Sequence, residues 1–413
     1  MLQEHSSTNG YERHEPSSAA THVPSYVVDL ARDLPSLKSR YSEIPAHPML
    51  SDLPILTKKD INSTRLDLIS RARLCESGSI LLGSGGTTAS PKVSVLPSSL
   101  FMESITQSWS PLEVGDVVVN ANNGGELGSM FPFFHLLCQI SGAVAIPLGG
   151  LGTKETIDTW IDFLYETKTT ALAGTPTQVA AILERLIHMD IRLPSLRKVL
   201  WSGERFNASA RRVVEEYGQL DLYGVYGSTE TWVVGYNGPA CPIDSFHVLP
   251  YQILEIVDGS ILVTTVHEEC LNPIVRYRIG DYGTQSSCPC DSLDKVITVG
   301  KRDDEQIKFL SILFDRDEPY EAVMALEDVV EAQIVLVNLG SADEFMEIQV
   351  VTRDHVENSD QVEHRICSSF LKSMYRLAHE VHDRPERIRV RKVNEIPPNP
   401  RTLKTPVLRM ESR

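Results

Sequence analysis

The stretch from Tyr226 to Glu230 (Tyr-Gly-Ser-Thr-Glu) places an aromatic ring, a glycine, two hydroxyls and a carboxylate within five residues. At the end of a strand, such a ring can stack on a flat base, and the hydroxyls can donate to a phosphate. A carboxylate at the same end can hold a magnesium ion that is bound to that phosphate. Tyr-Gly-Ser is also ordinary turn chemistry, so the stretch needs support from others that suit the same ligand. The candidate binding residues are Tyr226, Gly227, Ser228, Thr229 and Glu230.

A second candidate is the glycine-rich loop from Gly83 to Lys92, which follows a short apolar strand over residues 79–82. The backbone N–H groups of Gly86 and its neighbours, with the hydroxyls of Thr87 and Thr88, can wrap a polyphosphate, and Lys92 adds positive charge. The loop is not a Walker motif, because no Gly-Lys-Ser/Thr follows, and it lacks the last glycine of a dinucleotide fingerprint. A flexible surface loop is the alternative interpretation.

Apolar runs that alternate with helical patterns surround these loops. The predicted strands cover residues 117–120, 143–147, 171–174 and 198–201, and the predicted helices cover 131–140, 178–188 and 208–217. Thr57 and Asp60 have capping-box spacing and predict the start of another helix, and His135 is expected to be a core residue of the apolar helix 131–140. This alternation predicts an α/β fold with a mainly parallel sheet covered by helices, and such sheets bind ligands at the carboxyl ends of their strands. A hairpin pattern over 253–257 and 261–266, with Asp258-Gly259 at its turn, adds an antiparallel segment.

A second, smaller α+β unit follows in the sequence. Predicted strands over 334–338, 346–352 and 387–393 flank a predicted helix over 361–379, which is enough chain for a separate core. We expect a disordered leader at 1–24, a large domain at 25–301 and a small, mobile domain at 302–413.

The composition restricts the function. The chain has 413 residues, 42% of them apolar, and 39 Lys and Arg against 55 Asp and Glu give a net charge of −16. This charge argues against nucleic acid or an anionic membrane as a partner, although a local pocket can still be positive. The first 22 residues have no apolar signal core, and no apolar run is long enough to span a membrane. With seven cysteines, an odd number, these features predict a cytoplasmic protein.

Four residues could form a metal site. Cys241 and His247 are followed later by Cys288-Pro-Cys290, which together supply three thiolates and one imidazole. A Cys₃His set is typical of a closed, structural zinc site. Such a site would link the loop after Glu230 to the loop after Asp281. The alternative is four ordinary reduced residues.

Together the motifs resemble the adenylate-forming superfamily of acyl-CoA synthetases, adenylation domains and luciferases. The resemblance covers about residues 50–404, and its most specific part is the pair Tyr226–Glu230 and Tyr277–Asp281 (Tyr-Arg-Ile-Gly-Asp). The run from Arg276 to Arg278 and the Cys-Pro-Cys segment make the chain most similar to the phenylacetate–CoA ligase branch. The other matching positions are the loop 85–92, Gly203-Glu204, the connector 302–308 and Lys404.

The resemblance implies that ATP and a small carboxylic acid, expected to be aromatic, form an acyl-adenylate and pyrophosphate, and that the acyl group then passes to an acceptor. Because two anions must meet, the barrier is mainly electrostatic and positional. Trp232, Phe131 and Phe133 are candidates either for an acyl pocket or for the core. The resemblance also implies the residue roles. For the phosphates, Thr87, Thr88 and Lys92 hold the outer groups, Thr229 binds the α-phosphate, and Glu230 holds Mg²⁺. For the nucleoside, Tyr226 stacks on adenine, Asp281 accepts the ribose hydroxyls, Arg302 approaches the ribose or phosphate, and Gly203 and Glu204 border the nucleotide.

On the small domain, Asp304 is the implied hinge, and Lys404 bridges the carboxylate and the α-phosphate.

Simpler interpretations stay open for single residues. Asp281 would then close a turn, Glu230 would cap a helix, and Lys404 would be one more charge in a basic tail. The chain also departs from the family: Ala89 replaces a usual glycine, Lys301 occupies another glycine position, and no glycine precedes Lys404. A further departure is Leu310-Ser311, where the family has Arg-Gly. Because all of these departures except Ala89 lie at the connector or on the small domain, adenylation is better supported than thioester formation with CoA.

Three functions therefore stay open from the sequence. The first is acid activation followed by transfer to CoA, a carrier thiol or an amine. The second is an amide- or ester-forming synthetase that shares the first step. The third is a catalytically weak relative that binds nucleotide as a scaffold or sensor. A homodimer is compatible with each of them.

Overall fold

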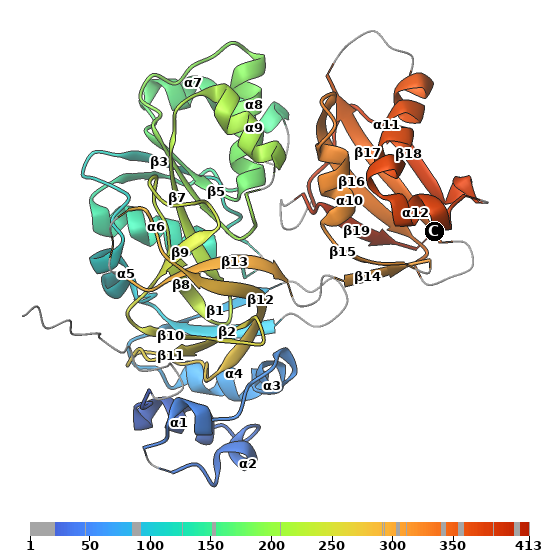
Figure 1. The fold of residues 1–413 in the computed structure, drawn as a ribbon. Coiled ribbons are helices and arrows are strands. Elements are labelled where there is room, and N and C mark those ends of the chain that lie inside the picture. The colour runs from blue at the N-terminus through green and yellow to red at the C-terminus, as the bar shows by residue number, and fades with distance from the viewer. Residues whose placement is uncertain are drawn as a thin grey trace, which may run out of the picture.

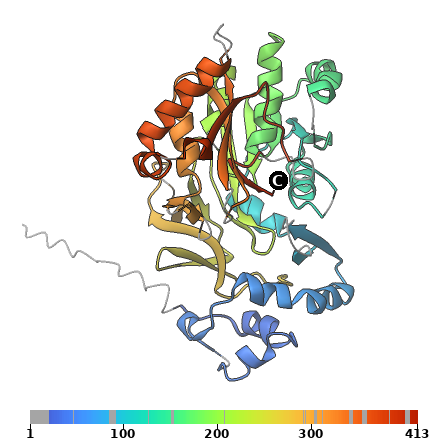
Figure 2. The ribbon, with the colours of Figure 1, turned by 90° about the vertical axis from the view of Figure 1, so that its right-hand side faces the viewer.

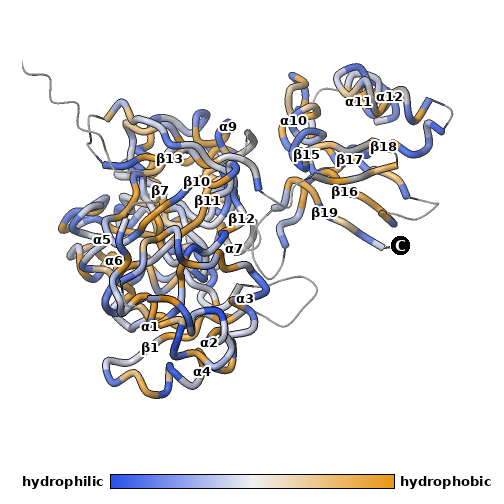
Figure 3. The backbone as a smooth tube through the Cα atoms, turned by 60° about the horizontal axis from the view of Figure 1, so that its bottom comes forward, coloured by the Kyte–Doolittle hydropathy of each residue, from blue (hydrophilic) through white to orange (hydrophobic). Residues whose placement is uncertain are grey.

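The structure is a computed structural model. It describes residues 21–45, 47–84, 92–125, 127–150, 154–206, 208–290, 292, 294–302, 306–310, 312–339, 344–353, 359–382, 384–399 and 405–412. Two lobes of unequal size are visible in Figure 1, and the smaller one is formed by the C-terminal part of the chain. Figure 3 shows hydrophobic segments along the strands of both lobes.

One mixed sheet runs through the large lobe. Its strand order among the described residues is β10-β11-β12-β13-β9-β8-β7-β6-β5-β3-β4. The strands from β4 to β7 pair in parallel, and all pairs from β7 to β10 are antiparallel. The α/β fold class is therefore confirmed, with the antiparallel segment continuing the same sheet. The strands are β3 (Val117–Asn120), β4 (Val144–Ile146), β5 (Ala171–Gly174), β6 (Lys198–Ser202), β7 (Asp221–Ser228), β8 (Trp232–Tyr236), β9 (Ser245–Val248), β10 (Gln252–Val257), β11 (Ser260–Thr265), β12 (Tyr277–Ser286) and β13 (Val296–Arg302).

The three predicted helices of the parallel half begin and end near the predicted positions, and the helices over 102–108 and 154–166 were not predicted. Thr175 caps α8 by accepting from the Gln178 N–H, while the Gln178 side chain accepts from the Thr175 N–H, so the helix starts at a reciprocal cap. The helices of this half are α5 (Met102–Ser108), α6 (Met130–Ser141), α7 (Lys154–Glu166), α8 (Pro176–His188) and α9 (Ala208–Tyr217). His135, which we expected to lie in the core of α6, is exposed.

The N-terminal segment packs beneath the antiparallel half of the sheet (Figure 1). It contains α1 (Ser25–Arg32), α2 (Lys38–Tyr41), a 3-10 turn (Leu50–Asp52), α3 (Lys58–Ser63), α4 (Arg65–Arg73) and the hairpin of β1 (Ser79–Ser84) with β2 (Lys92–Pro97). The predicted cap at Thr57 and Asp60 forms. His22 bridges to Met49 and Val23 is buried, so residues 22–24, which we assigned to the leader, belong to the folded part.

The small lobe has its own hydrophobic core, which includes Ile307, Phe309, one face of α11 (Val362, Ile366 and Phe370) and one face of β16 (Ala332, Ile334 and Leu336). The predicted helix over 361–379 is interrupted at Met374, and the strand β19 at the C-terminal end was not predicted. β19 pairs in parallel with β16, so the segment after Pro406 is part of the sheet. The elements are β14 (Gln306–Phe309), β15 (Ile312–Asp315), α10 (Glu318–Met324), β16 (Val329–Val337), β17 (Phe345–Thr352), α11 (Ser359–Ser373), α12 (Tyr375–Glu380), a 3-10 turn (Pro385–Arg387), β18 (Ile388–Lys392) and β19 (Leu408–Glu411).

None of the helices in the described part of the chain is long and apolar enough to cross a membrane.

The two lobes meet through a few polar contacts on the side of α8 and α9 (Figure 2). From α9, the Arg212 guanidinium donates to the carbonyl oxygens of Val329 (2.6 Å) and Met324 (2.8 Å) of the small lobe. Arg205 lies 3.5 Å from Asp317, and the Thr405 N–H lies 3.5 Å from Thr177 Oγ1. Few and polar contacts are typical of lobes that move relative to each other.

The Arg212 contacts predict that Arg212→Ala loosens the small lobe. Each lost hydrogen bond from a charged donor is worth about 1.5–3 kcal/mol. Small-angle X-ray scattering should therefore show a larger radius of gyration. Hydrogen exchange should be faster in α10, next to the Met324 carbonyl. Arg211→Ala is the matched control, because Arg211 bonds to Phe206 and Asp244 within the large lobe. Scattering curves that coincide for the two variants would contradict the prediction.

Candidate functional site

A cavity of about 520 Å³ lies at the carboxyl ends of β6 and β7, next to the start of α6 and α8. The end of a parallel sheet half is the expected position for a ligand site in this fold class. Residues from the N-terminal segment, both halves of the sheet and the end of β13 surround it. The lining consists of Lys58, Gly83, Asn122, Asn123, Gly125, Gly128, Ser129, Met130, Thr175, Gln178, Ser202, Gly203, Val225, Tyr226, Gly227, Ser228, Thr229, Glu230, Trp232, Val233, Tyr277, Ile279 and Arg302.

Tyr226 and Asp281 come from β7 and β12, which are far apart in the sequence, and they form a direct contact. The Tyr226 hydroxyl donates to Asp281 Oδ2 at 2.9 Å. Burial, and then the Asp281 carboxylate, raise the pKa of the Tyr226 phenol well above its usual value. The phenol is therefore a hydrogen-bond donor at neutral pH. Its ring is tilted against Phe246, with ring centroids 5.3 Å apart.

Gly227 allows β7 and β8 to approach closely. A Cβ atom at this position would overlap the Trp232 carbonyl group, so every residue other than glycine would push the two strands apart. The pairing of the strands shifts register between Tyr226 and Gly227. This irregularity terminates β7 where the chain turns into the Ser228–Thr231 loop.

The loop that carries Thr229 and Glu230 is held on several sides. Ser228 and Thr231 bond reciprocally, with the Ser228 N–H donating to Thr231 Oγ1 (3.1 Å) and the Thr231 N–H donating to Ser228 Oγ (3.2 Å). The Asn272 side chain donates to the Glu230 carbonyl at 3.0 Å. Only 5% of Glu230 is exposed, although its side chain borders the cavity. A buried carboxylate on a rigid loop is a suitable oxygen ligand for Mg²⁺.

Two cations reach the cavity of this acidic protein. Lys58 begins α3, and it lies here because the backbone of Leu56 pairs in parallel with Tyr277 of β12. Arg302 faces Asp281 across the β12–β13 pair, with Nε 3.6 Å from Oδ1. Positive charge at a phosphate site lowers the cost of bringing anions together. Lys58 was missed from the sequence, because only the long-range pairing of Leu56 indicates it.

Several predicted site residues occupy other positions or lie outside the described residues. Gly203 borders the cavity with φ +82°, but Glu204 accepts from the Thr177 N–H at 2.7 Å and so supports the first turn of α8. Glu204 is not among the residues that line the cavity. The predictions for Gly86, Thr87, Thr88, Asp304, Lys404 and the side chain of Lys92 fall outside the described residues.

The Cys₃His residues meet at one point. The candidate ligand atoms of Cys241, His247, Cys288 and Cys290 all lie within 4.8 Å of one another. His247 Nε2 is 3.5 Å from Cys241 Sγ and 3.1 Å from Cys290 Sγ. The side chain is buried, and its Nδ1 lies 3.9 Å from an Asp294 carboxylate oxygen. A ring with one nitrogen toward thiols and the other toward a carboxylate has the orientation of a metal ligand.

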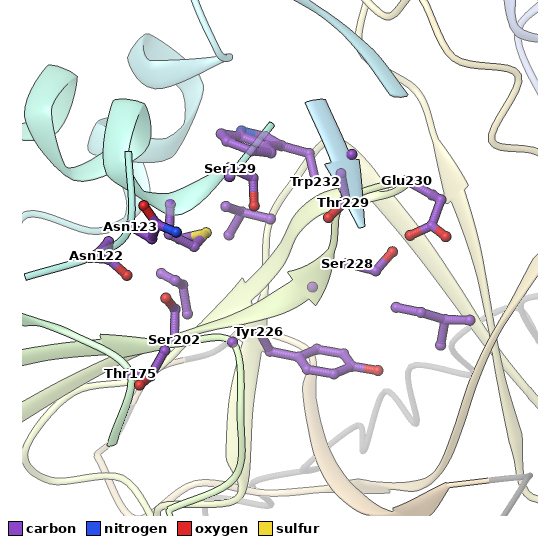
Figure 4. Close-up of a pocket in the computed structure, with 18 of the residues that line it drawn as sticks. Asn122, Asn123, Ser129, Thr175, Ser202, Tyr226, Ser228, Thr229, Glu230 and Trp232 are labelled. Carbon is purple, nitrogen blue, oxygen red and sulfur yellow. The ribbon is translucent and has the colours of Figure 1, made fainter. Parts of the chain in front are cut away.

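The end of the cavity away from Glu230 was not predicted from the sequence. Here Asn122, Asn123, Thr175 and Ser202 line the same cavity, and Figure 4 shows them opposite the side of Glu230 and Ser228. Ser129 lies between the two sides, next to Trp232. Trp232, which we considered for an acyl pocket, lies on the wall. Of the other aromatic candidates, Phe133 is fully buried in the core and Phe131 is not part of the lining.

Comparisons with known proteins agree with this site. The sequence model of the AMP-binding enzyme family matches residues 76–260, which include the cavity strands β3 and β5–β8. The matched stretch is a little less than half of the chain. Among solved structures, the chain is similar in fold to a 2-hydroxyisobutyryl-CoA ligase in complex with its acyl-AMP (TM-score 0.65, 17% identity, covering 89% of this chain and 84% of that one).

An anthranilate–CoA ligase in complex with anthranoyl-AMP is also similar in fold (TM-score 0.54, 18% identity, covering 79% of this chain and 64% of that one). Among curated proteins, indoleacetate–lysine synthetase of Pseudomonas savastanoi is 27% identical over 125 residues, which are 30% of this chain and 31% of that protein. The match therefore spans less than a third of that relative.

The close approach at Gly227 predicts that Gly227→Ala destabilises the large lobe. Overpacking against backbone costs about 1–3 kcal/mol, and in a lobe of this size each kcal/mol lowers Tm by about 2–4 °C. The expected results are a lower Tm in circular dichroism and a loss of AMP binding in calorimetry. Gly238→Ala is the control, because a Cβ there meets only the Tyr223 ring at 3.9 Å, an ordinary contact. Equal Tm values for the two variants would show that β8 moves to accommodate the Cβ atom without a loss of stability, which would contradict the prediction.

Proposed function

We propose that the protein activates a small carboxylic acid with ATP, forming an acyl-adenylate and releasing pyrophosphate. The observation that carries this proposal is the convergence of Tyr226, Thr229 and Glu230 on one cavity that Lys58 and Arg302 also line. Asp281 is not part of the lining but lies directly beside it, bonded to Tyr226 and 3.6 Å from Arg302. A base-stacking ring, an ionised acceptor for ribose hydroxyls, phosphate donors and a magnesium ligand are what an adenylate needs.

We assign the roles from the family resemblance, and the contacts of the described residues support part of the assignment. Asp281 accepts the ribose hydroxyls, and Tyr226, which is already bonded to Asp281, orients that carboxylate and offers its ring to the base. Thr229 donates to the α-phosphate, and Glu230 would hold a Mg²⁺ that neutralises phosphate charge. Lys58 and Arg302 supply further positive charge. We assign the outer phosphates to Thr87, Thr88 and Lys92 of the loop between β1 and β2.

We propose that Lys404 of the small lobe joins the acid to the α-phosphate by screening the two anions from each other. Thr405, the next residue, lies 3.5 Å from Thr177, at the start of α8 beside the cavity. Asp304, in the connector between the lobes, is the proposed hinge. A lysine that acts mainly in the transition state should be worth about 10² or more in kcat.

The acceptor of the acyl group is proposed from the relatives. The first fold neighbour is named as a CoA ligase, which supports CoA. The curated relative is named for joining indoleacetate to lysine, which supports an amine acceptor and so an amide-forming synthetase as the second candidate. The aromatic preference is supported by the phenylacetate–CoA ligase resemblance and by Trp232 on the cavity wall.

We also propose that Cys241, His247, Cys288 and Cys290 hold a structural zinc ion. The donor set is closed, with three sulfurs and one imidazole nitrogen, and it leaves no position for a substrate. The site would fasten the loop between β8 and β9 to the turn after β12. β8 pairs with β7, which carries Tyr226, and β12 itself carries Asp281. The zinc would therefore stabilise the distance between these two nucleotide residues.

The test of the activity is pyrophosphate exchange into ATP against a panel of carboxylic acids, with and without CoA or lysine. We expect exchange that depends on one acid class, and loss of more than about 10²-fold in Glu230→Ala and Asp281→Ala, because each removes charge stabilisation in the cavity. Glu216→Ala, on the exposed face of α9, is the control. ATP binding without exchange for any acid would indicate a scaffold or sensor instead.

The test of the zinc site is metal analysis of tag-free protein. We expect about one equivalent of zinc, and loss of the metal in Cys241→Ser with a Tm lower by about 5 °C or more, since the ion fastens two loops. Cys75→Ser is the control, because Cys75 lies outside the cluster. Less than about a tenth of an equivalent in the wild type would disprove the site.

A further inference from the structure

The end of the cavity that faces away from Glu230 is polar, although a plain aryl acid would need an apolar surface there. Among the residues at this end, Asn122 is only 4% exposed and Ser202 only 1% exposed, so both are nearly removed from solvent. They follow or end neighbouring strands of the parallel half, with Ser202 at the end of β6 and Asn122 two residues after β3. Figure 4 shows both side chains directed into the cavity.

Ser202 has a buried hydroxyl that is unsatisfied. Its Oγ has no hydrogen-bond partner in the part of the chain that the structure describes. A hydroxyl that is buried without a partner loses its hydrogen bonds to water and gains none in return, so it lowers stability. A ligand that hydrogen-bonds to this oxygen would offset that cost, so the hydroxyl favours a polar group on whatever fills this end.

The Asn122 side chain indicates whether that polar group is a hydrogen-bond donor or an acceptor. Its amide nitrogen donates to Asn120 Oδ1 at 3.0 Å, and the Asn120 amide nitrogen in turn donates to the Phe131 carbonyl at 2.9 Å. This chain fixes the orientation of both amides, because a flipped Asn122 would place two carbonyl oxygens against each other. Of the Asn122 side chain, the carbonyl oxygen Oδ1 is therefore the polar atom that is available to a ligand in the cavity. It is an acceptor only, and it therefore requires a donor.

The cavity also has an apolar part. Met130, Val225, Trp232 and Val233 are among the residues that line it. Trp232 is itself fixed, since its indole N–H donates to the Leu100 carbonyl at 2.9 Å. A compact apolar body with one polar substituent fits such a mixed wall, because each part of it meets a surface of its own kind.

We propose that the acid activated by this protein carries a hydroxyl or amino substituent, which donates to Asn122 Oδ1 and bonds to Ser202 Oγ. This inference rests on the proposed adenylation. It places the acyl group at the Asn122 end and the phosphates at the Glu230 end of the same cavity. An ether or a halide cannot donate, and an unsubstituted acid leaves both groups unpaired, so each of these analogues is discriminated against.

The experiment compares matched acids in the exchange assay: an unsubstituted acid, its hydroxyl and amino derivatives, and its methoxy derivative. A site built to bond a hydroxyl can reject the analogue that lacks it by as much as about 10⁴-fold. We expect kcat/KM for the best hydroxyl or amino acid to exceed that of its unsubstituted and methoxy partners by at least about tenfold.

Ser202→Ala should reduce that ratio by about tenfold and leave the KM for ATP unchanged. Ser260→Ala, which removes another buried strand hydroxyl outside the cavity, should leave both quantities unchanged. A raised KM for ATP in Ser202→Ala would show that the hydroxyl faces the nucleotide. An equal loss with every acid would show that it binds only water or supports the fold. Either result overturns the inference.

Different results would contradict the proposed adenylation and the proposed substrate class. Exchange that is supported equally well by unsubstituted and substituted acids leaves adenylation intact and overturns the substrate class. An absence of exchange with every acid, in a protein that still binds AMP, overturns the proposed function and this inference with it.

Discussion

The site depends on the close contact between the backbones of β7 and β8 at Gly227. On one side of this contact the sheet is parallel, and on the other it is antiparallel. The chain that reverses there must form a tight loop, and that loop carries Thr229 and Glu230. Because the Trp232 carbonyl fills the space where a side chain would be, the position of the loop is set by backbone sterics rather than by a flexible contact.

This constraint explains why residues from distant segments can share one cavity. The antiparallel half folds back so that β12 brings Asp281 to the Tyr226 hydroxyl, and β12 also pairs with the Leu56 segment that presents Lys58. The carbonyl oxygens of the loop are held from the same half, by Asn272 at residue 230 and by Gln252 at residue 231. The antiparallel half therefore fixes the position of residues that line the cavity together with the ends of β6 and β7 from the parallel half. A site fixed in this way can distinguish ligands by charge and hydrogen bonding, because its groups do not need to reorganise.

The sequence predicted those parts of the structure that depend on local patterns. The capped helices α3 and α8, the strands β3 and β5, the hairpin of β10 and β11, and the approach of the four Cys₃His residues follow from spacing and turn chemistry. It did not predict parts that depend on long-range pairing. Lys58 reaches the cavity only through the bridge between Leu56 and Tyr277, and β19 exists only because it pairs with β16. A motif match can also place a residue wrongly. Glu204 matched a nucleotide-binding motif, but its carboxylate accepts from the Thr177 N–H at the start of α8, and the residue does not line the cavity.

The polar end of the cavity carries evidence about the ligand that the sequence does not contain. The expected aromatic acid rests on the family resemblance and not on the residues of the site, and Phe133, which could have lined a pocket or the core, is fully buried in the core. The groups that face the ligand are an oriented amide and a buried hydroxyl, and neither stands out in a sequence where asparagine and serine are common in loops. Their value as evidence comes from burial, because an unsatisfied polar atom inside a protein has a cost that its environment must offset. An acid that offers a donor to Asn122 and a partner to Ser202 offsets that cost when it binds, and it is thereby distinguished from every analogue of the same shape that cannot.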